Sequence, residues 1–365
     1  WNMISPDHVQ ESVFGYLFHW LDEVSAITNT VRYGYQSTDA DLEQYYRTAF
    51  ALIRDNAAGS VLSAHTCLFK LLITMDLNDR ADDFLQIFLP MLDNRFPPEC
   101  WAQTLALLLM TQKEQEAKAV LDKYLALYPL EKIKNSLSVA DFAHRCGIKG
   151  FELESSVFRQ IMANTRDRVI EKNITGKSVA LVGNGPQETG KKQGGKIDDY
   201  DLVIRMNAYN LTDEYSRDYG SKCDIWYRTA GEYPNERQIR KKGNPLFSIV
   251  GTSPYGFDYP PFLVRQFADE LEKGHIIQSV STNDFKNVLK KTNIWSPSGG
   301  ALMSMWIKTI KPDFKLSDCF GLALSKNETP SGNWKRADGT VNPLPYYNMF
   351  YEWAQIHKLF EGNKI

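Results

Sequence analysis

Short apolar runs separated by longer amphipathic stretches mark the second half of the chain. These runs contain three to five mostly β-branched or aliphatic residues and do not alternate with polar ones, which is typical of strands buried on both faces of a parallel sheet. Because they alternate with helical stretches, they predict a layered α/β domain with a mainly parallel sheet. The runs are Val179–Val182, Leu202–Met206, Ile225–Tyr227, Leu246–Val250, Ile276–Val280 and Leu316–Phe320.

The first half has a helical pattern instead. From about residue 40 to residue 168 apolar positions recur with a helical period, for example over Trp101–Met110 and Lys113–Tyr128. Helices in pairs of about 34 residues resemble a tetratricopeptide array, although the consensus glycine and aromatic positions are not clear. We therefore expect an α-helical, repeat-like domain over residues 1–170 and an α/β domain over residues 171–365. The helical domain would bind a partner, or would shield or dimerise the other domain.

Composition narrows the classes of partner. The chain has 365 residues with 43% hydrophobic content, enough for two packed domains. The net charge of -2 implies neither nucleic acid nor an anionic membrane as a bulk electrostatic partner. No apolar run reaches the roughly 18 residues that a membrane span needs, and we expect neither a span nor a signal peptide in this sequence.

Cysteine usage points to the cytoplasm. The five cysteines are an odd number, are widely scattered and lack any C-x-x-C spacing, so we expect reduced thiols and no zinc site. They are Cys67, Cys100, Cys146, Cys223 and Cys319.

The strongest candidate chemistry follows the first predicted strand. Gly183 and Gly185 remove side chains where the backbone must turn tightly and where a ligand could approach its amides. Asn184 and Asn207 each close an apolar run, so both are expected at the carboxyl edge of the sheet, where open α/β folds bind ligands. Two carboxamides suit a nucleobase, ribose or phosphate, and this segment therefore predicts a nucleotide site.

Two alternatives apply to the same segment. A dinucleotide fold would need a glycine where Glu188 stands and an acidic residue at the end of the next strand, and the sequence has neither. A turn with a structural role only is the other alternative.

Two later segments add candidates. Ser298 precedes the apolar stretch Ala301–Ile310 and is expected to cap a helix, whose first amides, from Gly299, Gly300 and Ala301, would bind a carboxylate or phosphate. An ordinary capped helix is the alternative. Pro345–Glu352 is rich in aromatic residues, which on their own favour core packing.

Together these segments resemble the sialyltransferases defined by L, S, motif III and VS motifs, and more remotely the bacterial sialyltransferases that share the nucleotide-binding half. The resemblance runs from Lys177 to Gly362, is most specific in the L motif, and leaves the helical half without a counterpart in the animal enzymes. In the L motif it rests on Ala180–Pro186, Lys196–Asp198, Asp201, Leu202–Asn207 (family form V-L-R-M-N) and Tyr219–Lys222. In the S and VS motifs it rests on Pro297–Gly300 (P-S-T-G), Phe320, Gly321 and Tyr346–Glu352 (Y-H-x-x-x-Y-E).

The resemblance implies a Rossmann-like sandwich of the GT-A-variant type and an inverting transfer from a CMP-activated nonulosonic acid to a glycan hydroxyl, with no metal or other cofactor. Carried over by position, Asn184 and Asn207 would contact the cytidylate, and Gly321 would lie under it. The phosphate or the donor's carboxylate would bind at the capped helix start, through Ser298, Gly299 and Gly300. Asp199 and Asp201 spell the D-x-D of metal-dependent glycosyltransferases, but they lead into a strand and are interpreted as structural.

The chain departs from the family at the catalytic base. Tyr347 stands where the VS motif has histidine, and a tyrosine with an ordinary pKa near 10 is a poor base. Asp338, His275 or His357 could reach the acceptor instead; Glu352 could act directly; or Tyr347 could only orient a substrate. We take Tyr347, Glu352 and Asp338 as the catalytic candidates.

The donor and the biological setting are less constrained. Sialic acid, its bacterial relatives and Kdo all present a cytidylate and a carboxylate to these motifs. We expect a bacterial enzyme of capsule or lipopolysaccharide assembly at the inner face of the cytoplasmic membrane, with the helical domain offering a contact to a protein or the membrane surface. The alternatives are a non-catalytic CMP-sugar or glycan binding module that has lost the family's histidine, and a dehydrogenase.

Overall fold

The described residues form two compact units. The chain passes from the first unit to the second after Ser155, and the described residues between 254 and 260 belong to the first. No helix in the described part of the chain is long and apolar enough to cross a membrane. The computed structural model describes residues 81–94, 96, 98–133, 135–207, 209–228, 246–251, 254–255, 259–292, 298–322, 334–335, 341–342 and 356–361.

The first unit is helical. Helix α6 is its centre, because its residues are apolar on nearly every side and are buried from Cys100 to Leu109. It packs against α7, which buries one face, and against α8, which is buried from Leu137 to Ala143. The helices are α5 (Ala81–Phe88), α6 (Pro98–Met110), α7 (Glu114–Leu127), α8 (Leu137–Arg145) and the start of α9 (Glu152–Arg166), with short 3-10 turns at Leu89–Met91 and Leu130–Ile133.

Helices α6 and α7 form the hairpin that the helical period predicts. The turn between them passes through Gln112 in the left-handed region at φ 62°, and the Lys113 amide donates to the Leu108 carbonyl at 2.7 Å. The repeat-like domain over residues 1–170 stays a prediction, because residues 1–80 lie outside the described residues.

The second unit contains a six-stranded parallel sheet, as the apolar runs predict. The strand order is β5-β4-β3-β2-β1-β6, so the chain builds outward from β1 in one direction and then places β6 on the other side of β1. All five strand pairs are parallel. The strands are β1 (Val179–Val182), β2 (Leu202–Met206), β3 (Ile225–Arg228), β4 (Phe247–Val250), β5 (Ile276–Ser279) and β6 (Cys319–Phe320).

One predicted strand is shorter than expected. Leu316–Asp318 forms a 3-10 turn, and only Cys319–Phe320 pairs with β1. The reason is local, because the Asp318 carboxylate accepts a hydrogen bond from the Lys315 amide at 2.8 Å and stabilises the turn.

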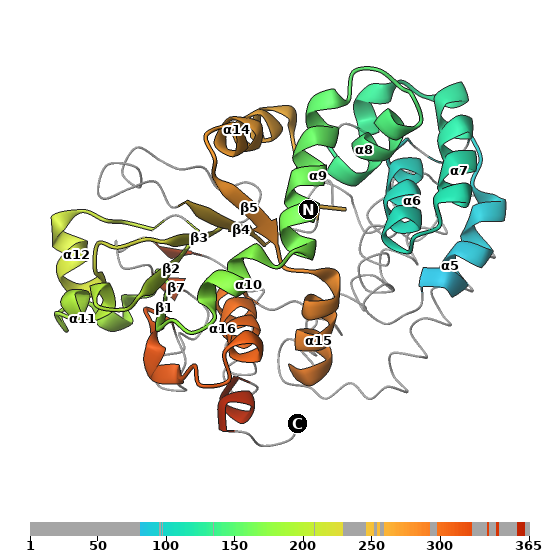
Figure 1. Cartoon of the computed structure of the whole chain (residues 1–365). Helices are drawn as coiled ribbons and strands as arrows, with labels where there is room; N and C mark the ends of the chain where they lie inside the picture. The colour runs from blue at the N-terminus through green and yellow to red at the C-terminus, as the bar shows by residue number, and fades with distance from the viewer. Residues whose placement is uncertain are drawn as a thin grey trace, which may run out of the picture. The chain divides into compact units, whose positions relative to one another are not determined.

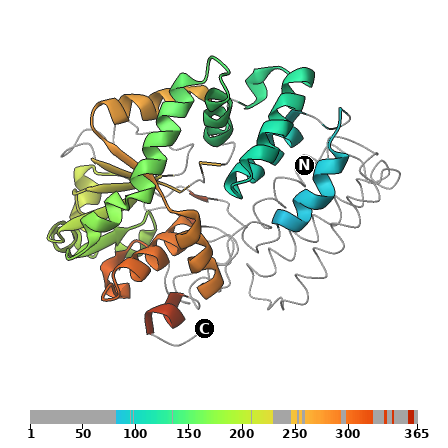
Figure 2. The ribbon, with the colours of Figure 1, turned by 45° about the vertical axis from the view of Figure 1, so that its right-hand side comes forward.

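Helices cover both faces of the sheet (Figure 1). Leu181 points to the core shared with α10, α15 and α16, whereas Ala180 and Val182 point to the core shared with α11 and α12. Both views show α15 and α16, in orange, side by side (Figures 1 and 2). These helices are α10 (Val169–Ile174), α11 (Gly194–Asp198), α12 (Asp213–Tyr219), α14 (Pro261–Glu272), α15 (Thr282–Thr292) and α16 (Gly299–Ile310), followed by β7 (Trp334–Lys335), β8 (Val341–Asn342) and a helix at 356–361.

The end of α9 and the start of α10 cover the outer edge of β5. The Asn164 carboxamide donates to the Ile277 carbonyl at 2.9 Å, and the Ser279 amide donates to the Thr165 hydroxyl at 3.1 Å. The Gln278 carboxamide accepts from the Ile170 amide at 3.0 Å. The first two bonds satisfy backbone groups that an edge strand otherwise leaves open, and the third attaches the start of α10 to a β5 side chain.

Candidate nucleotide-binding site

The order in which the chain adds strands to the sheet reverses between β1 and β6. Open α/β folds bind ligands at such a switch point, outside the carboxyl ends of the strands. Gly183 follows β1 and Gly321 follows β6, so the two glycines meet there. The ladder continues through them, because the Gly183 amide donates to Phe320 and the Gly185 amide donates to Gly321, each at 2.8 Å.

Glycine is needed at both positions because the two backbones touch. A Cβ on Gly183 would lie 2.3 Å from Leu322 Cδ2 and 2.5 Å from the Gly321 carbonyl oxygen. Gly321 has a φ of 61°, and a Cβ there would lie 2.7 Å from the Gly183 carbonyl oxygen. β6 and its extension take both amides, so neither N–H is available to a ligand in this arrangement, and the role of Gly183 and Gly185 in nucleotide binding stays a prediction.

The two asparagines are brought together as expected. Asn184 follows β1, and its Nδ2 donates to the carbonyl of Met206 at 2.8 Å, directly before Asn207. Among the described residues, none donates a hydrogen bond to Asn184 Oδ1.

The backbone of Asn207 is held firmly. It has a left-handed φ of 48°, its amide donates to Tyr227, and its carbonyl accepts from the Trp226 indole at 2.9 Å. The turn after β2 thus has a fixed geometry at the carboxyl edge.

The start of α16 lies at the same edge. Ser298 caps the helix as predicted, and its Oγ accepts from the Ala301 amide at 3.2 Å. A Cβ on Gly299 would lie 3.1 Å from Met206 Cε, and one on Gly300 would lie 3.0 Å from Leu322. The helix start therefore packs directly beside the turns after β2 and β6. The Ala301 amide is occupied by the cap, so of the three amides expected to bind an anion only those of Gly299 and Gly300 remain.

Tyr227, which ends the predicted third strand, belongs to the same group although sequence reasoning did not select it. Its side chain lies 3% exposed between two glycines. A Cβ on Gly251 would lie 2.1 Å from its hydroxyl oxygen, and one on Gly299 would lie 2.9 Å from its ring. The signal in the sequence was its position, since it closes an apolar run at the same edge as Asn207.

Of the residues considered as the catalytic base, the structure describes only His275 and His357. Tyr347, Glu352 and Asp338 lie outside the described residues and stay predictions. His275 is described and directly precedes β5, so it lies at the amino edge of the sheet, roughly 13 Å from the carboxyl edge given the rise of a four-residue strand. It is therefore not placed to act on a ligand beside Asn184. His357 is 3.7 Å from Glu361 on the helix at 356–361.

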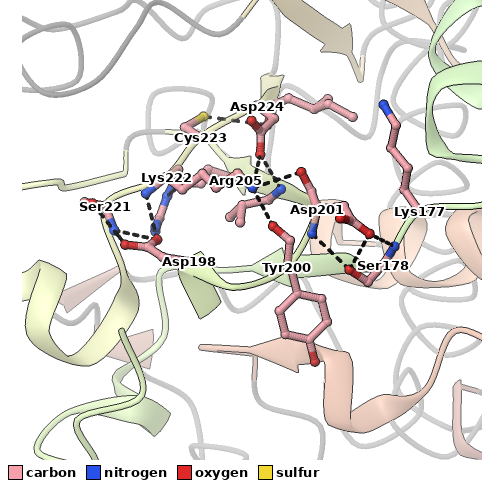
Figure 3. A network of polar contacts seen from close by, with 12 residues as sticks. Lys177, Ser178, Asp198, Tyr200, Asp201, Arg205, Ser221, Lys222, Cys223 and Asp224 are labelled. Atoms are coloured by element: carbon pink, nitrogen blue, oxygen red, sulfur yellow. Dashed lines mark hydrogen bonds and ion pairs between the residues drawn. The ribbon is translucent and has the colours of Figure 1, made fainter. Parts of the chain in front are cut away.

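Asp198, Asp201 and Lys222 of the L motif belong to a network of polar contacts around the start of β2 (Figure 3). The Asp201 carboxylate accepts from the amide and the hydroxyl of Ser178, both at 2.8 Å, and these bonds lower the pKa of Asp201. The second aspartate of the D-x-D sequence thus joins the starts of β1 and β2. Among the described residues, no group of three or more His, Cys, Asp or Glu side chains is arranged to hold a metal ion.

Asp198, the last residue of α11, fixes the end of α12. Asp198 accepts from the amides of Ser221 and Lys222 at 2.8–2.9 Å. Lys222 Nζ in turn donates to the carbonyls of Tyr200 and Asp201. These bonds hold the connection from α12 to β3 against the start of β2 (Figure 3).

Arg205 joins this connection from inside the protein. Its side chain in β2 is 1% exposed and donates to the Lys222 and Tyr219 carbonyls, both at 2.8 Å. Burial lowers the pKa of its guanidinium, and the carbonyls compensate for part of the lost hydration. The polar L-motif residues Asp198, Asp201, Arg205 and Lys222 therefore stabilise the fold around β2.

Comparisons with known proteins agree with the resemblance in this part of the chain. Residues 130–248 match the model of Glycosyltransferase family 29 (sialyltransferase). A CMP-N-acetylneuraminate-beta-1,4-galactoside alpha-2,3-sialyltransferase from Mus musculus is 27% identical over 129 residues, and those from Rattus norvegicus and Homo sapiens are each 26% identical over 129 residues. Each match covers 34% of this chain and 33% of the relative, so the chain matches about a third of the length of these relatives.

A crystal structure of a mammalian sialyltransferase in complex with Gal-beta-1-3GalNAc-ortho-nitrophenol has a TM-score of 0.41 and 16% identity, covering 63% of this chain and 84% of the other. The matched residues 130–248 contain β1, β2 and β3 with Asn184 and Asn207. Ser298 and the VS-like segment lie outside them. The relatives named above are mammalian, and the expected bacterial origin stays a prediction.

Proposed function

We propose that this protein is an inverting CMP-sugar-dependent glycosyltransferase that moves a sialic acid or a related nonulosonic acid to a hydroxyl of a glycan. The sialyltransferase similarity over residues 130–248 supports the reaction class. The observation that carries the proposal is geometric: Asn184, Asn207 and the capped start of α16 converge at the carboxyl edge of the sheet, beside the β1–β6 switch point.

In this proposal the asparagines hold the cytidylate. The Asn184 Oδ1 atom faces the nucleotide, while its Nδ2 is used to fix the turn after β2. A carbonyl oxygen accepts from N–H and O–H groups only, so it would recognise the cytosine amino group or a ribose hydroxyl rather than the phosphate.

The start of α16 supplies the charge stabilisation. As the CMP group leaves, negative charge grows on the phosphate, and the Gly299 and Gly300 amides with the helix dipole stabilise it without a metal. The acceptor hydroxyl must lose its proton in the same displacement, and Tyr347, Glu352 and Asp338 are our candidates for the base or for the group that orients the acceptor. We place the activity in the cytoplasm, in capsule or lipopolysaccharide assembly, with sialic acid or Kdo as the donor sugar.

The test is turnover of defined donors. The protein is incubated with CMP-sialic acid or CMP-Kdo, with and without acceptor glycans, and released CMP is measured. We expect release from one donor that rises with the right acceptor. CMP binding without turnover of either donor would favour the alternative, a non-catalytic CMP-sugar binding module. Tighter binding of NAD(P)H than of CMP in a thermal shift assay would favour a dehydrogenase.

Variants test the residue roles. Asn184→Ala and Asn207→Ala should each weaken CMP binding about tenfold, as expected for the loss of a hydrogen bond in a desolvated site. Asn283→Ala is the matched control, because Asn283 is an exposed residue of α15. Tyr347→Phe should spare CMP binding and reduce turnover. Wild-type affinity in both asparagine variants would contradict the assignment of the site.

A further inference from the structure

Tyr219, the last residue of α12, holds the turn of the candidate site. Its side chain is 5% exposed, and its hydroxyl donates to the Gly185 carbonyl at 2.7 Å. The same hydroxyl lies 3.1 Å from Thr189 Oγ1. Gly185 and Thr189 flank the 3-10 turn Pro186–Glu188, so one phenol oxygen joins both ends of the turn that follows Asn184.

The ring of Tyr219 touches the site from the other side. A Cβ on Gly321 would lie 3.1 Å from Tyr219 Cε1, so the ring packs against that glycine. The carbonyl of Gly321 accepts from the Gly185 amide at 2.8 Å. Tyr219 therefore contacts the turn after β1 and the turn after β6 at once.

The neighbouring Asp218 extends this contact along the loop. Its carboxylate, 5% exposed, accepts from the Gly190 amide at 2.7 Å and from the Lys192 amide at 2.9 Å. The end of α12 thus binds the backbone of residues 185–192 at three carbonyl or amide groups. This loop is rich in glycine and would otherwise lose much conformational entropy when a ligand orders it.

The anchor itself is rigid. The Tyr219 carbonyl accepts from the buried Arg205 guanidinium at 2.8 Å, and Gly220 ends α12 at a φ of 74°. Burial raises the pKa of Tyr219, so its hydroxyl keeps its proton and stays a donor at neutral pH. The hydrogen bond to Gly185 is therefore present throughout the physiological range.

We propose that Tyr219 is a positioning residue of the nucleotide site, which orders the loop at residues 185–192 so that Asn184 meets the cytidylate with a smaller entropic cost at binding. The inference rests on the proposed function and deepens it. Preorganisation of this kind strengthens binding without a contact between Tyr219 and the ligand.

The chain offers a matched control for the test. Tyr200 packs against Phe320 with ring centroids 6.0 Å apart, on the same face of the sheet as Tyr219, and its hydroxyl donates to Asp318 at 2.9 Å. Its hydroxyl bonds at Asp318, before the start of β6, and not at the turn after β1. Tyr219→Phe and Tyr200→Phe each remove one hydroxyl from a partly or fully buried tyrosine, but only the first loosens the turn.

Four measurements separate positioning from stability. Thermal unfolding without ligand should fall by a similar amount in both variants. Only Tyr219→Phe should speed amide hydrogen exchange over residues 185–192 and weaken CMP binding, by roughly fivefold to tenfold for one hydrogen bond. With a donor that turns over, KM for the donor should rise more than kcat falls. Thr189→Val changes an exposed residue and should alter hydrogen exchange and CMP affinity in the same direction as Tyr219→Phe, but by a smaller amount. This variant replaces Tyr219→Phe in the test if Tyr219→Phe does not fold.

The outcomes are distinguishable. If the wild-type protein does not bind CMP, the proposed function fails and the inference falls with it. If the wild-type protein binds CMP and Tyr219→Phe binds it as tightly as Tyr200→Phe, the inference is overturned while the proposed function stands. Unchanged exchange over residues 185–192 in Tyr219→Phe would overturn it as well.

Discussion

Gly183→Ala tests whether the meeting of β1 and β6 determines the stability of the sheet. Gly183 lies within the described core of the second unit, and its amide continues the ladder by donating to Phe320 at 2.8 Å. An added Cβ would overlap Leu322 Cδ2 at 2.3 Å and the Gly321 carbonyl oxygen at 2.5 Å. The leucine end can rotate away, but the carbonyl belongs to the backbone and cannot.

The size of the effect follows from that carbonyl. It must retreat by roughly 1 Å to reach an ordinary contact, and overpacking of this kind typically destabilises a protein by about 1–3 kcal/mol. The same movement lengthens the bond that Gly321 accepts from the Gly185 amide, which adds about 0.5–1.5 kcal/mol. We therefore expect a free energy of unfolding lowered by about 1.5–4.5 kcal/mol.

Urea unfolding followed by circular dichroism measures this change as a shift of the midpoint at constant slope. Gly195→Ala is the matched control, because a Cβ on this glycine of α11 meets no atom within 4 Å and its φ is not positive. That variant should be as stable as the wild type or up to about 1 kcal/mol more stable. A Gly183→Ala protein as stable as Gly195→Ala would refute the close approach of the two strand ends.

Three further changes have defined outcomes. Ser298→Ala removes the cap that accepts from the Ala301 amide and should cost about 1 kcal/mol in urea unfolding, while Ser298→Asp should recover most of it. Asp218→Asn tests a pH effect: two loop amides lower the pKa of this carboxylate, so its contribution is complete above the unfolded value of about 3.9 and is lost as the pH falls through the folded value. The stability difference between wild type and variant should therefore shrink below about pH 4, and a constant difference would contradict this role. Glu270→Ala leaves the fully buried Arg228 without its carboxylate and should cost about 3–5 kcal/mol by thermal or urea unfolding, whereas the double variant Arg228→Met with Glu270→Leu should be more stable than Glu270→Ala alone.

The sheet could be predicted from the sequence because a strand that is buried on both faces consists of consecutive apolar residues. The only polar residue in the runs Val179–Val182 and Leu202–Met206 is Arg205, and the parallel sheet buries that side chain as well. The cap at Ser298 was predictable for the same reason, since the hydroxyl and the helix it stabilises are neighbours in the chain.

Roles that depend on distant parts of the chain could not be predicted. Gly183 was expected to give a ligand access, but it makes room for Gly321, which lies 138 residues later in the sequence. Tyr219 reads as an ordinary aromatic residue at the end of a short helix, and only the fold brings its hydroxyl to the Gly185 carbonyl. The predicted anion site lost the Ala301 amide because the cap and the ligand compete for it.

Because the end of α9 and the start of α10 cover the edge of β5, they limit how far the protein can be truncated from its N-terminal side. A truncated protein that starts at residue 171 would keep all six strands but lose Asn164 and Thr165, which close the backbone of β5. An open edge strand invites pairing with a second molecule, so such a fragment should aggregate during expression. Biochemists who want the α/β unit alone should begin upstream of residue 156, so that the last turns of α9 are retained.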